Sequence, residues 1–167
     1  MGIIPGNDPE DPEDAITRSA ALKEAGALDE AEALLMPLLQ ADLRCLDAHV
    51  HLGNLDFDRR PDKAARHYRV TQDIGELSLG PGFRDVLLWG HINNRPYLRA
   101  LHGLALCLWR LNQRPEAIAI VERMLWLNPP DNQGVRFLLP DIQAGISWEA
   151  SSDNHGNQAT DAARSAS

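Results

Sequence analysis

The sequence is poor in cysteine and in long apolar runs, and each shortage excludes a class of protein. Only two cysteines occur, Cys45 and Cys107, without a Cys-x-x-Cys or Cys/His spacing, which excludes a disulfide framework and a zinc site. No apolar run approaches the roughly 20 residues that a membrane span needs, and the N-terminus is acidic and proline-rich rather than basic and apolar. We therefore expect a cytoplasmic protein without a membrane partner.

Basic charge is also in short supply, because 24 Asp and Glu face 16 Lys and Arg and the net charge is −8. The imbalance is uneven: residues 1–58 carry 13 acidic against 3 basic side chains, whereas residues 59–136 carry 7 against 12. Even the basic middle interleaves acids, and the whole chain would repel a phosphate backbone. The charge pattern excludes nucleic acid as a partner and favours association with an acidic protein or between copies.

Motifs with catalytic spacing are missing as well. The chain has no glycine-rich phosphate loop, no nucleophile elbow and no metal-binding helix motif. His49 and His51 lie two residues apart and so face different sides of a helix, where they cannot share a metal ion. We expect no catalytic residue, no cofactor and no metal, and hence a protein that is not an enzyme.

What the sequence does contain is a repeated tight turn that leads into a helix. The segments 26–31 and 112–117 are two copies of it, and a weaker copy ends at Ala65. Ala31 and Ala65 lie 34 residues apart, whereas Ala65 and Ala117 lie 52 apart, which equals one period of 34 plus an insertion of 18. Helix signals around these turns predict antiparallel helix pairs at 13–42, 46–75 and 97–128.

Other segments are assigned from their composition. Residues 77–96 form the insertion, which we expect to be ordered and helical over 83–89, and a capping helix is expected near 132–143. Trp126 is predicted to be a core or capping residue, and Asp56 occupies a position that the repeat normally fills with a buried apolar residue. Residues 1–12 and 149–167 lack periodicity and are predicted to be disordered, which leaves 13–148 as one domain.

A 34-residue period of paired helices is typical of tetratricopeptide repeats. The chain resembles a small bacterial protein of this TPR family over roughly 12–148, with the best match in the third copy. Large, small and proline positions of the family pattern fall there on Leu101, Leu104, Ala105, Leu108, Ala117 and Pro129. The resemblance implies an all-α fold, a right-handed α-solenoid of about three TPR helix pairs plus an inserted helix and a C-terminal capping helix.

The resemblance also implies a function, since TPR solenoids hold a peptide or a partner helix in a concave groove lined by the first helix of each pair. The chain would thus be a protein–protein interaction scaffold for an acidic or amphipathic segment. Ile16 and Ala20 stand where chaperone adaptors of the family place carboxylate-binding side chains, so that activity is not expected. The candidate groove residues are Asn54, Phe57, Arg95, Arg99, His102, Leu106, Trp109 and Arg110.

Three alternatives remain open at this point. The insertion could form a lid over a polar site with His91 and His102, which would make the protein a small enzyme or a ligand-binding protein. Trp109 could pack against the insertion instead of contacting a ligand. The basic run over 59–69 could be a solvated face or a docking strip for an acidic partner, and the charge split is compatible with self-association.

Overall fold

The computed structural model describes residues 11–153, and this part of the chain is all-helical, without a β-strand. Three antiparallel helix pairs are followed by short helical elements. None of the described helices is both long and apolar enough to cross a bilayer. The elements are α1 (Pro12–Glu24), α2 (Leu28–Ala41), α3 (Leu46–Asp56), α4 (Pro61–Leu79), the 3₁₀ helix η1 (Ile92–Asn94), α5 (Arg95–Arg110), α6 (Arg114–Leu127), the 3₁₀ helix η2 (Val135–Phe137) and α7 (Leu139–Ala144).

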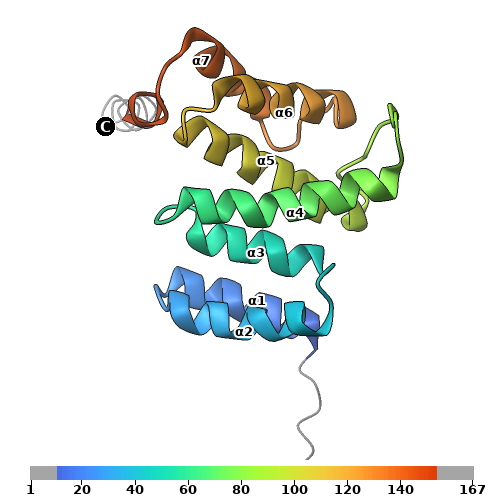
Figure 1. Ribbon diagram of the computed structural model, residues 1–167, viewed down its shortest axis with the longest axis vertical. Helices are drawn as coiled ribbons and strands as arrows, with labels where there is room; N and C mark the ends of the chain where they lie inside the picture. Colours follow the sequence, from blue (N-terminus) through green and yellow to red (C-terminus); the bar gives the residue numbers. More distant parts are fainter. Residues whose placement is uncertain (1–10, 154–167) are drawn as a thin grey trace, which may run out of the picture.

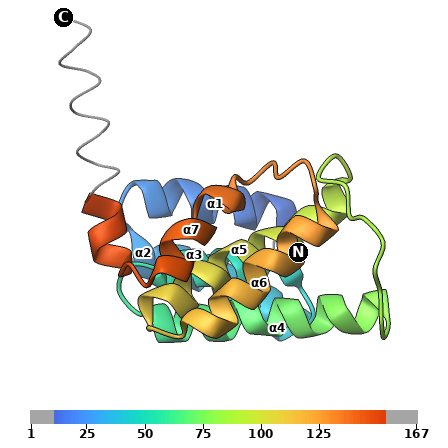
Figure 2. The same ribbon diagram turned by 90° about the horizontal axis from the view of Figure 1, so that it is seen from above.

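The helices are stacked in chain order, from α1 and α2 at one end to α7 at the other (Figure 1). Each helix packs on the next along the chain, and the first helices of the pairs also contact one another, α1 with α3 and α3 with α5. Seen along the stack, α1 and α4 lie on opposite sides of the molecule (Figure 2). The predicted all-α class and the sequential packing of the helices are confirmed.

Local sequence signals account for where the helices begin and turn. The Asp11 carboxylate accepts a hydrogen bond from the Glu13 amide and so caps α1, and proline occupies the first turn of α1, α4, α5 and α6. Gly26 adopts a φ of 80°, the left-handed conformation that the turn between α1 and α2 requires. The corresponding residue of the third pair, Asn112, has a φ of 58°.

Tyr68 of α4 is inserted between α3 and α5 at two glycines. A Cβ atom added at Gly53 of α3 would lie 2.6 Å from the Tyr68 ring, and one added at Gly103 of α5 would lie 2.4 Å from it. Any side chain at either position would therefore overlap the ring. In this position the Tyr68 hydroxyl reaches Asn54 and donates a hydrogen bond of 2.6 Å to its Oδ1.

The expected helix over 83–89 is wrong. Helix α4 extends to Leu79, into the predicted insertion, and Gly80 and Gly82 then take φ values of 86° and 75°. From there to η1 the chain forms turns and irregular backbone. The Leu87 amide donates to the Leu127 carbonyl of α6, at 2.6 Å, instead of to a carbonyl of its own turn. Tertiary hydrogen bonds thus replace the helical ones.

Two side chains of α6 fasten this loop to the body of the protein. Arg123 donates to the Phe83 carbonyl at 3.0 Å, and the Trp126 indole N–H donates to the Arg84 carbonyl at 2.8 Å. The side chains of Phe83 and Leu87 pack against the core. Trp126 is 56 % exposed, so of its two predicted roles the one in the core is wrong: its indole reaches over the loop to the Arg84 carbonyl.

The C-terminal cap is shorter and later than predicted, since α7 begins at Leu139 rather than near residue 132. Residues 148–153 form a further short helical segment, so the predicted disorder from residue 149 does not hold there. Ser151 is buried, and its hydroxyl donates to the Asp141 carboxylate at 2.6 Å. The other residues predicted to be disordered, 1–10 and 154–167, lie outside the described part, whereas Asp11 and Pro12 belong to the start of α1.

Candidate functional site

Two adjoining hollows of about 260 and 250 Å³ cross the first helices of the three pairs. Lys23 of α1 and Asn54 of α3 line both, so we treat them as one groove running from α1 over α3 to α5. The residues that complete its lining are Ser19, Ala20, Glu24, His51, Leu55, Phe57, Tyr68, Arg99, His102, Gly103, Leu106 and Gln133.

The floor of the groove is amphipathic. Phe57 and Leu106 are half-buried and give it an apolar part, and the Tyr68–Asn54 hydrogen bond gives it a polar part. Burial raises the pKa of Tyr68 well above its usual value, so the phenol stays neutral and donates to Asn54. Because Asn54 accepts through Oδ1, its amide N–H groups are left to face the groove as donors.

Two basic side chains stand in the groove without a carboxylate partner in the part of the chain that the structure describes. Neither Lys23 nor Arg99 forms an ion pair with any residue in 11–153. The Arg99 guanidinium lies over the Trp89 ring, 5.5 Å from its centroid, and Arg95 lies over the same ring at 5.4 Å. The loop thereby contributes an aromatic support that holds Arg99 at the rim of the groove.

Two histidines of the groove are held largely neutral at pH 7. Burial is the main cause that lowers the pKa of His51, with Arg99 and Lys23 adding to it and Asp47 opposing it. Burial likewise lowers the pKa of His102, against the opposing charge of Asp131. A carboxylate that entered the groove would oppose both effects.

Five of the eight predicted groove residues line the groove in the structure. These are Asn54, Phe57, Arg99, His102 and Leu106. Arg95 does not line the groove, and its Nε donates a hydrogen bond of 3.0 Å to the Trp89 carbonyl.

Trp109 and Arg110 have other partners than the groove. Trp109 is only 3 % exposed, its indole N–H donates to the Ile146 carbonyl at 2.8 Å, and its ring meets Trp148 edge-on at 5.4 Å. Arg110 donates to the backbone carbonyls of Phe57 and Asp58. Of the two alternatives for Trp109, the structure shows packing, although against the C-terminal segment and not against the insertion.

Sequence reasoning missed Lys23, His51 and Gln133. A signal existed for Lys23, because it follows Ile16 by seven residues and Ala20 by three and so lies on the same face of α1. Gln133 lies far from the other lining residues in sequence, and nothing local predicts that it approaches within 3.4 Å of the His102 ring. His91 is exposed and lines none of the hollows around His102, so the structure does not bring the two histidines together in one pocket.

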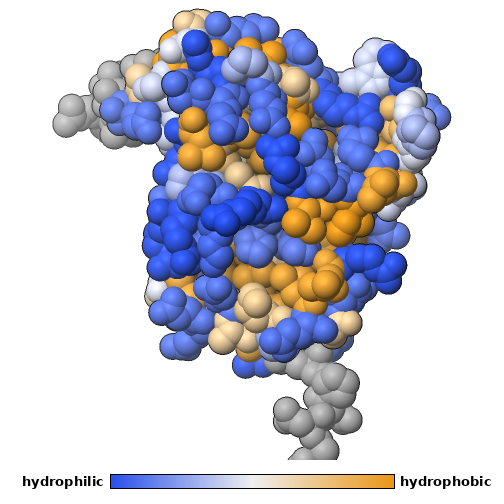
Figure 3. Space-filling model, in the orientation of Figure 1, coloured by the Kyte–Doolittle hydropathy of each residue, from blue (hydrophilic) through white to orange (hydrophobic). Residues whose placement is uncertain are grey.

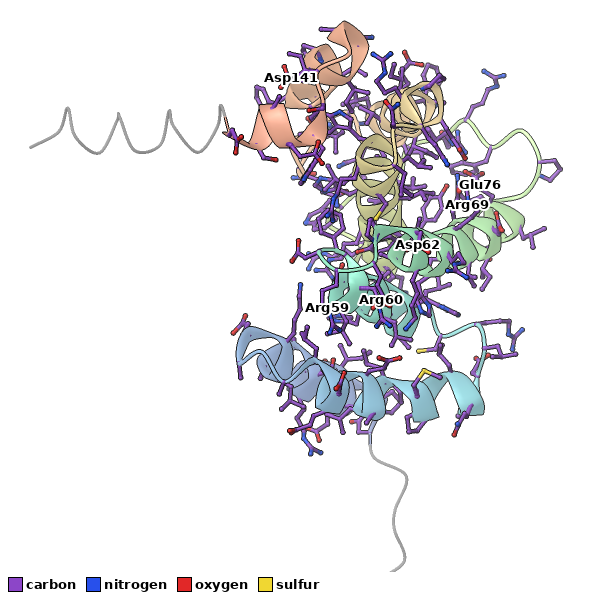
Figure 4. All side chains as sticks on the ribbon, turned by 60° about the vertical axis from the view of Figure 1, so that its left-hand side comes forward. Arg59, Arg60, Asp62, Arg69, Glu76 and Asp141 are labelled. Carbon is purple, nitrogen blue, oxygen red and sulfur yellow. The ribbon has the colours of Figure 1, made fainter. Side chains whose placement is uncertain are left out.

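The basic run over 59–69, of which Figure 4 labels Arg59, Arg60 and Arg69, is largely neutralised by carboxylates of the described residues. Asp56, at 2 % exposure, holds Arg60 at 2.5 Å and Lys63 at 3.1 Å. This pairing explains how an acidic residue occupies a normally apolar position. Glu32 also lies 3.9 Å from Arg60 and 3.3 Å from Lys63. Arg66 pairs with Asp62 at 3.0 Å and Arg69 with Glu116 at 2.8 Å. Most of the basic side chains of this strip are thus paired with carboxylates of the same chain, whereas Lys23 and Arg99 of the groove have no such pair within residues 11–153.

A histidine pair between α3 and α4 was also missed. The Nδ1 atoms of His49 and His67 lie 3.2 Å apart, and His49 Nε2 lies 2.9 Å from the Leu43 carbonyl. A carbonyl can only accept, so His49 donates through Nε2, and in the neutral ring its Nδ1 then accepts from His67. The described residues hold no group of three or more potential metal ligands, and the pair links two helices.

Comparison with protein families, with curated protein sequences and with solved structures gives no match for this chain. The chemistry of the groove itself therefore carries the functional argument. Its cations, amide donors and apolar floor can hold an anionic chain non-covalently.

Proposed function

We propose that this protein is a protein–protein interaction module of the TPR type, a right-handed α-solenoid whose groove binds an acidic peptide segment. One observation carries the proposal. In a chain with a net charge of −8, Lys23 and Arg99 face one groove over α1, α3 and α5 without a carboxylate partner among residues 11–153.

The groove carries two cations, Lys23 and Arg99, against one carboxylate, Glu24, and this balance favours an anionic occupant. Both cations are exposed to water in the free protein, so a carboxylate gains most where the bound segment covers the pair and water screens it less. Hydrogen bonds to charged groups contribute about 1.5–3 kcal/mol each. The Asn54 amide adds a neutral donor between the two cations, which suits a carboxylate or a peptide carbonyl.

The apolar floor sets a second requirement on the segment. Phe57 and Leu106 are half-buried beside the cations, so a ligand gains most if an apolar side chain lies next to its acidic ones. Combined hollows of this size hold a few side chains, not a folded domain. We therefore expect a short segment in which Asp or Glu alternates with Leu or an aromatic residue.

A peptide array tests this function directly. We expect the full chain to bind peptides that mix Glu with Leu or Phe, and to ignore the same peptides with Lys in place of Glu. The double variant Lys23→Glu/Arg99→Glu should weaken binding at least about tenfold, and added salt should weaken wild-type binding in the same direction.

The matched control carries the same charge change elsewhere. Arg66→Glu/Arg84→Glu alters the net charge equally but involves exposed residues that do not line the groove. If both double variants lose the same amount of peptide affinity, the loss comes from the overall charge and not from the groove. Equal binding of the Glu and Lys peptides would refute the proposal.

A further inference from the structure

An exposed apolar side chain continues the groove beyond Arg99. The 3₁₀ helix η1 runs directly into α5, since the Arg95 amide donates to the Ile92 carbonyl. Positions 92, 95, 99, 102 and 106 follow one another at intervals of three and four residues, which places them on one face of the η1–α5 segment. Arg99, His102 and Leu106 of this face line the groove. Ile92 stands at the other end of the face and is 72 % exposed.

Trp89 joins this end of the face to the groove. Its ring is contacted by the guanidinium groups of both Arg95 and Arg99, at 5.4 and 5.5 Å from the centroid. We call the surface formed by Trp89, Ile92 and Arg95 the ledge. Because the Arg99 side chain lines the groove and also lies over the Trp89 ring, the ledge and the groove form one continuous surface.

The ledge is held in place by its backbone. The loop that leads to it passes from the α4 side of the molecule to the α1 side (Figure 2). The Leu87 amide donates to the Leu127 carbonyl of α6 at 2.6 Å, and the Asn94 side chain donates to the Leu88 carbonyl at 3.1 Å. A surface that is already ordered loses little conformational entropy when a ligand binds to it.

Exposed apolar side chains alone do not select a ligand. On the face shown in Figure 3 they also gather over the second half of α4, where Val70 is 37 % and Leu77 82 % exposed. Neither residue lines the groove, so the charges of the groove select no occupant for that patch. The ledge differs, because Arg95 and Arg99 beside it form no ion pair within residues 11–153. An apolar surface next to two such cations suits a segment with an apolar side chain near an acidic one.

We propose that the ledge binds an apolar side chain of the same acidic segment that enters the groove, so that the partner carries one more anchor beyond its acidic residues. This inference rests on the proposed peptide binding. Ile92 precedes Arg99 by seven residues, which is about 10 Å along the helix axis. An extended peptide covers that distance in about three residues. The partner should therefore carry Leu or an aromatic residue about three positions from the acidic residue that pairs with Arg99.

Isothermal titration calorimetry of the full chain with synthetic peptides tests the ledge. Each peptide contains a core that mixes Glu with Leu, followed or preceded by a Leu about three residues beyond the last Glu, and has a counterpart of equal length with Ser in place of that Leu. Placing the Leu at either end tests both chain directions. One of the two Leu peptides should bind about tenfold more tightly than its Ser counterpart. Ile92→Ser should remove this gain and leave the affinity for the Ser counterpart unchanged.

Leu77→Ser is the matched control. It removes an equally exposed apolar side chain from the α4 patch without a change of charge, and it should keep the gain. Circular dichroism shows that each variant remains folded. Equal affinities for Leu and Ser peptides in the wild type overturn the inference and leave the proposed function standing. So does a loss in Ile92→Ser that is the same for both peptides, or a loss of the gain in Leu77→Ser.

Two further outcomes have a different meaning. If none of the peptides binds, the proposed function fails and the inference fails with it. Sedimentation of the wild type without peptide, compared with Ile92→Ser, tests a second copy as the occupant. A dimer that Ile92→Ser dissociates would assign the ledge to that second copy and overturn the inference.

Discussion

Gly103→Ala should destabilise this protein, although an alanine normally stabilises the interior of a helix. The reason is the position of the Tyr68 ring. It lies within 2.4 Å of the place where the new methyl group would stand, and within 2.6 Å of the corresponding place at Gly53 on its other side. The ring therefore cannot move away from α5 without moving into α3.

Two opposing terms give the expected size of the effect. Replacing glycine by alanine in a helix contributes about 0.5–1 kcal/mol in favour of the folded state. Inserting a methyl group into a closed contact costs about 1–3 kcal/mol. The difference of the two ranges is a net loss of up to about 2.5 kcal/mol, centred on about 1 kcal/mol, which corresponds to a fall of up to roughly 10 °C in melting temperature for a chain of this size.

Urea unfolding followed by circular dichroism measures this loss, and a second background tests its cause. In Tyr68→Leu the outer half of the ring is gone, so Gly103→Ala should change sign and stabilise that variant by some tenths of a kcal/mol. If Gly103→Ala stabilises the wild type, or destabilises both backgrounds equally, the ring is not wedged between the two helices as described.

Three further outcomes follow from packing and charge. Ala117→Trp should unfold the third pair, because Ala117 is fully buried and overpacking costs about 1–3 kcal/mol or more; an unchanged melting temperature would contradict this. Asp56→Ala should lower the free energy of unfolding, measured in urea titrations, by about 1–3 kcal/mol, and Asp62→Ala by less than about 0.5 kcal/mol, because of these two carboxylates Asp56 is buried and Asp62 is exposed. Burial lowers the pKa of His51 and His102, so the unfolded chain takes up their protons first as the pH falls below about 6.5. Melting temperatures should therefore be higher at pH 7.5 than at pH 5.5, and a His51→Gln/His102→Gln variant should show a smaller difference between these two pH values.

Features that depend on neighbouring residues could be predicted from the sequence. The bounds of the three helix pairs follow from apolar periodicity, prolines in the first turns and Gly26 at the turn, all of which act within a few residues. Glycine at position 53 also has a local meaning, since an aromatic ring of the next helix occupies the space where a side chain would stand. Most of the groove on α3 and α5 was found in the same way, by counting helical faces.

Features that depend on distant residues could not be predicted. The 83–89 segment has apolar residues at helical spacing, but its polar backbone groups find partners on α6, some 40 residues away. Trp109 lies on the expected helix, yet a carbonyl 37 residues further along the chain binds its indole and Trp148 covers it. Periodicity indicates which side of a helix is apolar and does not indicate what will cover that side.

The aromatic contacts of Trp148 bear on how the protein unfolds. Trp148 meets the Phe57 ring at 6.0 Å, the Trp109 ring at 5.4 Å and the Arg110 guanidinium at 5.9 Å, so the end of the described chain is fastened to its middle. Stacked repeats in contact only with their neighbours can open one unit at a time from an end. Here, separating the last helices would also expose the turn between α3 and α4. The elements α5, α6, η2 and α7 should therefore open together with the second pair, α3 and α4, as one cooperative unit. Helices α1 and α2 are then the part of the described chain that can fray independently.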